Sequence, residues 1–100
     1  FCPIGPWLTS ADEVEPSNLD VQCWVNGELR QNANTRDLIF DIPAIIESIS
    51  ASMTLETGDI IATGTPAGVG IGFSPPRFLR SGDVVKVAIS GLGEIANRVV

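Results

Sequence analysis

The stretch at residues 62–78, ATGTPAGVGIGFSPPRF, constrains the fold of this chain more than any other segment. It places four glycines and three prolines in seventeen positions, and short apolar runs flank it. Proline lacks the backbone N–H that helices and sheets use, and glycine weakens both elements, so neither can continue through the stretch. The stretch must be a loop, either one that binds a ligand or one that only connects two elements.

The glycines of this loop match neither common nucleotide-binding motif. A Walker loop needs a glycine followed by lysine, and no glycine in the chain has that neighbour. A dinucleotide fingerprint opens a helix, whereas Gly72 is followed by Phe-Ser-Pro-Pro, which cannot carry helical hydrogen bonding onward. Both nucleotide-binding interpretations of this loop therefore fail on composition and context.

The same loop has the composition of a carboxylate site. Gly64 lets the backbone approach a ligand closely, Thr65 supplies a hydroxyl donor, and Pro66 stiffens the turn. Neutral O–H and N–H donors are suitable partners for a carboxylate. Loops are also glycine-rich simply because turns need unusual backbone angles, so the residues alone leave the connector interpretation open.

The clearest local prediction is a β-hairpin at residues 20–31. The run VQCWVNGEL has apolar residues at every second position before Asn26-Gly27. This dipeptide is preferred at the centre of a type I′ turn, because both central positions need positive φ. We therefore expect two antiparallel strands joined at this turn.

The remaining pattern predicts one helix and several short strands. Asp41 can cap a helix over residues 42–52, with a proline tolerated in its first turn. Its expected buried stripe consists of Ile42, Ile45, Ile46, Ile49 and Met53. Short strands are expected at residues 59–63, 84–89 and 94–100. With five or six strands and one helix, the chain should be a mostly-β domain of the roll or barrel class.

A net charge of −6 and the absence of histidine exclude several classes of function. Nucleic-acid binding needs clustered lysine and arginine, and the basic residues here are scattered. Without histidine there is no Ser-His or Cys-His pair and no His-ligated metal, so any metal would be held by oxygen. No apolar run approaches the roughly 18 residues of a membrane helix, so we expect no membrane partner.

The two cysteines, Cys2 and Cys23, do not form the dense framework of small secreted domains. A disulfide between them is conceivable, but Cys23 lies within the strand-like run. We expect two free thiols in a reducing compartment, which favours a cytoplasmic protein.

Two charged groups are further candidates for a site. Asp12, Glu13 and Glu15 offer oxygen ligands for a divalent cation, but neighbouring side chains in one short segment do not converge. A solvated turn capped by serine is the favoured interpretation. Arg77 and Arg80 could clamp an anionic substrate, although scaffold roles for them are favoured.

Several phrases of the chain, taken together, resemble the fumarylacetoacetate hydrolase family. They are FCPIGPW, WVNGELRQ, MTLETGDIIATGTPAGVG and SGDVVKV, and they occur in the family's order across essentially the whole chain. The long core phrase is far more specific than a lone glycine pattern. The chain looks most similar to the bacterial branch of 2-hydroxyhepta-2,4-diene-1,7-dioate isomerases and acylpyruvate hydrolases.

This resemblance implies a mixed β-roll catalytic domain that uses Mg²⁺ or Mn²⁺. It also implies a small 2-oxo or enol dicarboxylic acid as substrate, in aromatic catabolism, with C–C bond hydrolysis, isomerisation or decarboxylation as the reaction. Thr65 of the T-G-T-P motif, with Gly64 beside it, is then expected to bind the substrate carboxylate. The resemblance further implies a homodimer of the full-length protein.

The family's metal ligands, an E-x-E pair and a later Asp, correspond to positions upstream of Phe1, as does its catalytic lysine. We therefore expect residues 1–100 to be the C-terminal portion of one catalytic domain, inactive by itself, without catalytic or metal-binding residues of its own. Two alternatives stay open: a non-catalytic binding or assembly module that retains the fold, and a small acidic β-domain without a ligand.

Overall fold

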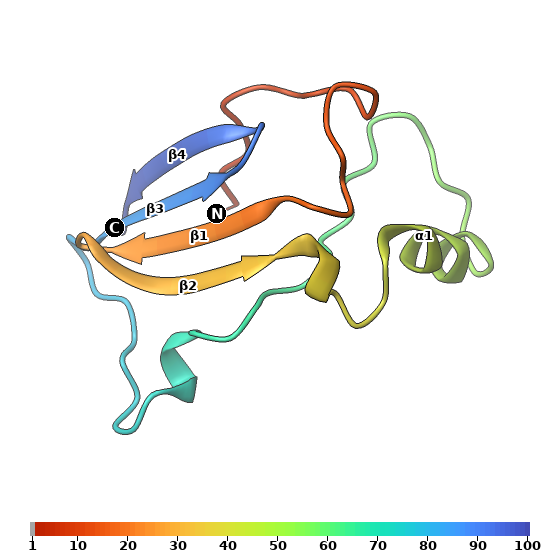
Figure 1. The fold of residues 1–100 in the computed structure, drawn as a ribbon. Coiled ribbons are helices and arrows are strands. Elements are labelled where there is room, and N and C mark those ends of the chain that lie inside the picture. The colour runs from red at the N-terminus through yellow and green to blue at the C-terminus, as the bar shows by residue number, and fades with distance from the viewer. Residues whose placement is uncertain (1) are drawn as a thin grey trace.

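The computed structural model describes residues 2–100 and is built around one antiparallel sheet of four strands, in the order β2-β1-β3-β4 (Figure 1). The strands are β1 (Asp20–Val25), β2 (Glu28–Asn34), β3 (Val84–Ile89) and β4 (Gly93–Arg98). The helical elements are α1 (Ile42–Ser50) and two 3₁₀ turns, η1 (Thr35–Asp37) and η2 (Gly70–Gly72). The prediction of a mostly-β fold with one helix is confirmed, and no helix in the described range is long and apolar enough to cross a membrane.

The β1–β2 hairpin has the predicted turn. Asn26 and Gly27 have φ angles of 51° and 82°, as a type I′ turn requires. The Asn26 side chain also holds the turn against the start of β3, because its amide donates to Asp83 and its carbonyl accepts from the Val84 N–H, both at 2.9 Å. The hairpin is thus fastened to the rest of the sheet at its tip.

A β-bulge interrupts the hairpin between Cys23 and Trp24, close to the Asn26-Gly27 turn. Trp24 stands opposite Leu29, but its neighbour Cys23 stands opposite Gln31, so Arg30 is an extra residue on β2. Because directly opposed residues share a face of the sheet, the bulge places Gln31 on the face of Cys23. The sequence prediction of a regular hairpin did not include this irregularity.

One face of the sheet is apolar. The register places on it Val21, Cys23, Val25, Val85, Val87, Ile89 and Ile95. These side chains are half-buried, and within residues 2–100 the only buried hydrophobic residue is Leu19, which is still 9% exposed. The described residues therefore cover this face only in part.

Helix α1 begins as predicted but its stripe is less buried than expected. The Asp41 carboxylate accepts from the Ala44 N–H at 2.8 Å, and the helix ends at Ser50 rather than near residue 52. Ile46 is 43% exposed and Met53 is 60% exposed, which contradicts the prediction of a buried isoleucine stripe. The reason is geometric. Helix α1 lies beyond the C-terminal end of β2 (Figure 1), and no strand packs extensively against it.

The prediction of a buried strand at residues 59–63 was wrong. This segment is irregular in the structure, and Ile60 is 73% exposed. A strand forms only where a neighbour accepts and donates its backbone hydrogen bonds, and this segment has no such neighbour among the described residues. The sheet consequently has four strands rather than five or six, while the expected β3–β4 hairpin is present.

Gly27→Ala should destabilise the protein by about 1–2 kcal/mol, because an L-residue at this positive φ is strained. A Cβ on Gly27 would meet nothing within 4 Å, so the effect isolates the backbone term. Urea unfolding of the intact protein measures it. Gly72→Ala is the control, because Gly72 lacks a positive φ and its Cβ would make an ordinary 3.8 Å contact with Val69. Equal losses in the two variants would contradict the turn assignment.

Candidate functional site

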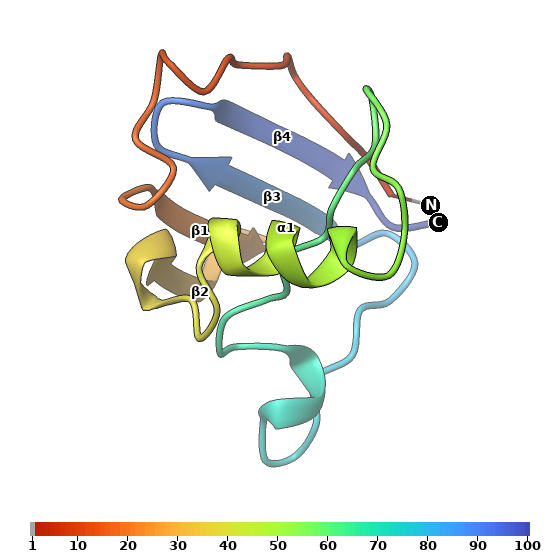
Figure 2. The same cartoon turned by 90° about the vertical axis from the view of Figure 1, so that its right-hand side faces the viewer.

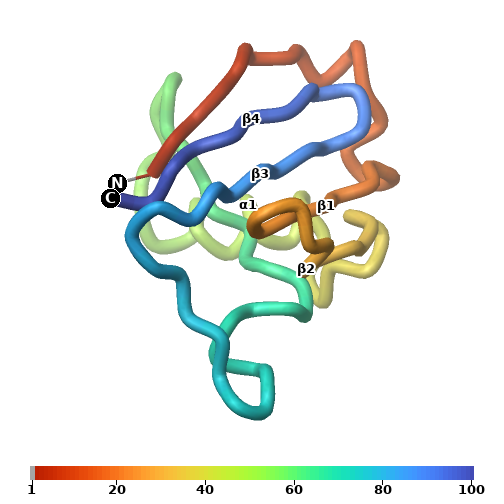
Figure 3. Tube along the Cα trace, turned by 90° about the vertical axis from the view of Figure 1, so that its left-hand side faces the viewer, coloured from red at the N-terminus to blue at the C-terminus, as the bar shows by residue number. Residues whose placement is uncertain are grey.

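The Gly-Pro loop, residues 62–78, projects from the β2 edge of the sheet. Figures 1, 2 and 3 show this segment, with η2 near its tip, beyond β2 in all three orientations. Apart from η2 it has no regular secondary structure, so its shape depends on contacts with other elements. Those contacts are concentrated on β2.

The closest contact joins Gly68 to the β2 bulge. Gly68 has a φ of +106°, and a Cβ at this position would overlap the carbonyl oxygen of Arg30. Only glycine combines this backbone angle with so close an approach. The bulge residue and the loop backbone therefore lie directly against each other.

Gln31, the residue after the bulge, forms the second contact. Its Nε2 donates to the hydroxyl oxygen of Thr65 at 2.8 Å and to the carbonyl oxygen of Pro66 at 2.9 Å. One half-buried side-chain amide thus holds both the predicted ligand-binding threonine and the proline that follows it.

Thr65 and Gly64 lie at the exposed surface of the loop. Gly64 has a φ of +101°, and a Cβ there would meet nothing within 4 Å. Within residues 2–100, the N–H groups of Gly64 and Thr65 donate to no protein acceptor. Two neighbouring residues of the loop thus offer a hydroxyl and two N–H groups without a protein acceptor among the described residues, and each is a type of group that can donate to an anionic ligand.

A third attachment lies further along the loop, around Phe73. Arg77 makes two hydrogen bonds of 2.7 Å to the Glu28 carboxylate, and the guanidinium carbons of Arg30 and Arg77 lie 5.0 and 5.3 Å from the centre of the Phe73 ring. The hydrogen bonds from Arg77 lower the pKa of Glu28, which keeps that carboxylate ionised. Arg77 is therefore engaged by the scaffold, which favours the scaffold interpretation over an anion clamp.

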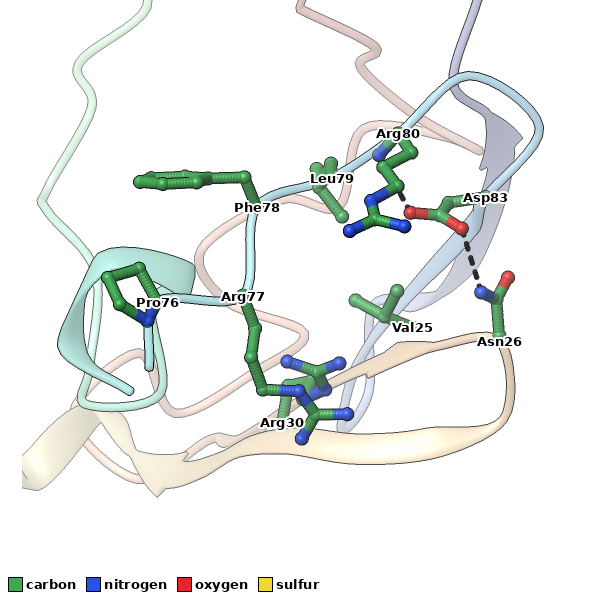
Figure 4. Close-up of a pocket in the computed structure, with 9 residues that line it drawn as sticks. All are labelled: Val25, Asn26, Arg30, Pro76, Arg77, Phe78, Leu79, Arg80 and Asp83. Atoms are coloured by element: carbon green, nitrogen blue, oxygen red, sulfur yellow. Dashed lines mark hydrogen bonds between the residues drawn. The ribbon is translucent and has the colours of Figure 1, made fainter. Parts of the chain in front are cut away.

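A pocket of about 370 Å³ lies beside this attachment, between the loop and the hairpin tip (Figure 4). Arg80 borders it, and its N–H donates to Asp83 at 2.8 Å. The hydrogen bond from the Asn26 amide, and then that from Arg80, lower the pKa of Asp83. None of residues 62–68 lines this pocket, so it is distinct from the Thr65 region. Its lining consists of Val25, Asn26, Arg30, Pro76, Arg77, Phe78, Leu79, Arg80 and Asp83.

The acidic candidates near the N-terminus do not converge. Glu13 accepts from the Ser10 hydroxyl at 2.9 Å, and Glu15 accepts from Ser17, so each carboxylate is held by a nearby serine. The segment forms an exposed turn, as predicted. Across the described residues there is no group of three acidic or cysteine side chains that could hold a metal ion.

Cys2 and Cys23 are both free thiols, as expected. Burial raises the pKa of Cys23, and the nearby Arg30 opposes that effect only partly. A thiol kept protonated in this way is a poor nucleophile, so Cys23 serves as part of the apolar sheet face.

Sequence analysis missed the role of Gln31. It lies in the strand that follows the predicted turn, where the mostly polar run RQNAN gave no reason to single out one side chain. The strand lacks an apolar residue at every second position. This was the available signal that β2 lies at an edge of the sheet and that its side chains contact polar groups rather than an apolar core. The contact with Thr65, 34 positions away, depends on the bulge and has no local signature.

Known proteins resemble this chain over its whole length. A family model described as fumarylacetoacetate (FAA) hydrolase C-terminal matches residues 1–100. Oxaloacetate tautomerase YisK from Bacillus subtilis (strain 168) is 54% identical over 99 residues, which cover 98% of this chain and 33% of that protein.

Solved structures agree with the fold. Maleylpyruvate hydrolase from Sphingobium sp. SYK-6, in complex with manganese(II) ion and pyruvate, has a TM-score of 0.89 and 54% identity. The 2-hydroxyhepta-2,4-diene-1,7-dioate isomerase from Mycobacterium marinum has a TM-score of 0.87 and 47% identity. Each match covers 100% of this chain and 36% of the other. The chain thus spans about a third of the length of the relatives it matches.

Gly68→Ala should displace the Gly-Pro loop from β2, because the new methyl group would overlap the Arg30 carbonyl. We expect the backbone strain of about 1–2 kcal/mol and a further loss of about 1–3 kcal/mol from overpacking. Urea unfolding and the rate of proteolysis within residues 62–78 measure both effects. Gly58→Ala is the matched control, since Gly58 has a similar φ of +98° but open space around it. Identical behaviour of the two variants would show that the loop is not held at this contact.

Proposed function

The chain belongs to the fumarylacetoacetate hydrolase family, and from that premise we propose that residues 1–100 are the C-terminal portion of one catalytic domain. The parent enzyme would be metal-dependent and act on small 2-oxo or enol dicarboxylic acids. Within it, this portion would supply the contact to a substrate carboxylate through Thr65 and Gly64.

The geometry around Thr65 is the observation that carries this proposal. Its hydroxyl oxygen is held by Gln31, while the adjoining N–H groups are exposed and unpaired within the described range. Neutral donors that are neighbours in an exposed loop and have no protein acceptor are suitable partners for a carboxylate.

The relatives support the substrate class. One matched protein is an oxaloacetate tautomerase, and another was solved with manganese(II) ion and pyruvate. Oxaloacetate and pyruvate are both 2-oxo acids, so each presents a carboxylate next to a carbonyl. We propose the same arrangement of groups in the substrate of the parent enzyme.

Reaction type is a separate question from substrate recognition. The matched proteins include a hydrolase, an isomerase and a tautomerase on closely similar chains. One fold supports several chemistries, so residues outside this segment would choose among hydrolysis, isomerisation and decarboxylation. The carboxylate contact is the part that such reactions can share.

The residues present here do not fit a metal centre. The acidic side chains near the N-terminus are held singly by serines, and nowhere in residues 2–100 do three such ligands converge. We propose that Mg²⁺ or Mn²⁺ is held by residues of the parent protein outside this segment. No chemical step of the metal is assigned to this chain.

The homodimer and the role in aromatic catabolism stay proposals that rest on the family resemblance, and the cytoplasmic location stays a proposal that rests on the two free cysteines. A non-catalytic binding or assembly module is the second candidate. The half-covered apolar sheet face favours it, because a face of that kind needs a partner. The presence or absence of an E-x-E pair upstream of Phe1 in the gene product, read by intact-mass and sequence analysis, separates the two candidates.

Thr65→Val in the full-length protein should lower kcat/KM for a 2-oxo dicarboxylic acid such as oxaloacetate by roughly ten- to a hundred-fold. The expectation follows from the loss of one charge-assisted hydrogen bond, worth about 1.5–3 kcal/mol. Steady-state kinetics measure it, with Thr63→Val as the control of identical chemistry two positions earlier. Turnover at the wild-type rate by Thr65→Val would leave the loop as a connector only.

Residues 1–100 alone should bind neither Mg²⁺ nor Mn²⁺ stoichiometrically, because their carboxylates are held apart. Titration calorimetry at neutral pH is the measurement. Micromolar binding with a stoichiometry of one would reveal a site that the structure does not assemble. Asp12→Asn, Glu13→Gln and Glu15→Gln variants would then identify its ligands.

A further inference from the structure

We propose that Gln31 is a positioning residue that sets the direction in which the Thr65 hydroxyl donates its proton. The inference rests on the proposed function and deepens it, because it names the group that prepares Thr65 for a carboxylate. Gln31 touches no substrate in this scheme and acts only through Thr65 and Pro66.

The Pro66 carbonyl fixes the orientation of the Gln31 amide. A backbone carbonyl can only accept a hydrogen bond, so the group that faces it at 2.9 Å must be the NH₂ group of Gln31 and not its oxygen. The same nitrogen lies 2.8 Å from the Thr65 hydroxyl oxygen. The two hydrogens of one NH₂ group therefore serve the two acceptors.

The orientation of Gln31 decides the orientation of Thr65. Because Gln31 donates, the Thr65 oxygen accepts, and the hydroxyl proton must point to a different group. Within residues 2–100 no acceptor lies within hydrogen-bonding distance of that proton, and Thr65 is exposed. The Thr65 hydroxyl is thus left to donate its proton to a group outside the described residues.

The β-bulge explains why Gln31 can do this. If the same sequence paired regularly from the turn onward, Arg30 would stand opposite Cys23 and Gln31 would lie on the other face of the sheet, since side chains alternate along a strand. The bulge also presents the Arg30 carbonyl to Gly68, which fixes the loop at the distance that the Gln31 side chain spans. Strand, bulge and loop thus combine to aim one hydroxyl group.

The test is a double-mutant cycle on the full-length, Mn²⁺-loaded protein, with pyruvate binding measured by calorimetry. Gln31→Met keeps the length of the side chain and removes the donor. We expect Thr65→Val and Gln31→Met each to weaken the Kd for pyruvate about ten-fold. The double variant should bind within about two-fold of Thr65→Val, because residues that act as one unit are not additive.

Gln22→Met is the matched control. Gln22 is also half-buried on a strand, but on the opposite face, where its amide donates to Asn32 at 3.2 Å. It should bind pyruvate as the wild type does. Unchanged thermal midpoints for Gln22→Met and Gln31→Met would show that both variants remain folded.

A second variant gives a readout that a merely structural role would not move. In Gln31→Glu, an ionised carboxylate would accept the hydrogen bond of the Thr65 hydroxyl, whereas a protonated one has a single O–H that can be donated to the Thr65 oxygen. Pyruvate affinity relative to wild type should therefore be poor at pH 8 and recover about ten-fold toward pH 5. A ratio that is independent of pH would overturn the proposal.

The outcomes separate the two levels of inference. Wild-type affinity in Thr65→Val would overturn the proposed function and, with it, the role of Gln31. Weakened binding in Thr65→Val combined with wild-type affinity in Gln31→Met, or with fully additive losses near a hundred-fold, would overturn only the positioning role.

Discussion

The contact of Gly68 with the Arg30 carbonyl is the constraint on which the rest of the site depends. The internal backbone hydrogen bonds of the Gly-Pro loop all lie within residues 69–77, so residues 62–68 depend on β2 for their position. The bulge brings a backbone carbonyl to the loop, and a residue without a side chain meets it there. The amide of Gln31 and the Arg77–Glu28 pair then hold the loop on either side of this contact.

Charged and neutral hydrogen-bond donors act at different places in this arrangement. The guanidinium groups of Arg30 and Arg77 lie against Glu28 and the Phe73 ring, within the scaffold. The proposed carboxylate contact uses a hydroxyl and backbone N–H groups instead. On binding a ligand, a neutral donor loses less hydration than a lysine or arginine does, and it adds no positive charge to a chain whose net charge is −6.

The sequence allowed correct predictions of the features that depend on neighbouring residues in the chain. The turn at Asn26-Gly27 and the cap at Asp41 follow from the chemistry of neighbouring residues, and both are present. The strand at residues 59–63 and the buried stripe of α1 needed partners that the described residues do not supply. Gln31 was missed because its contact with Thr65 arises from an extra residue on one strand, which alternation of apolar residues cannot reveal. The role of Thr65 itself came from the family resemblance and stays a prediction.

The bulge also makes the scaffold and the site separable in evolution. Removal of Arg30 would restore regular pairing without moving Gln31 from its place opposite Cys23, so the strand register on both sides would survive. The carbonyl that lies against Gly68 would be lost, however, so the loop would no longer contact β2 at that point. A one-residue insertion or deletion in β2 can thus change the reach of the loop while the sheet stays the same.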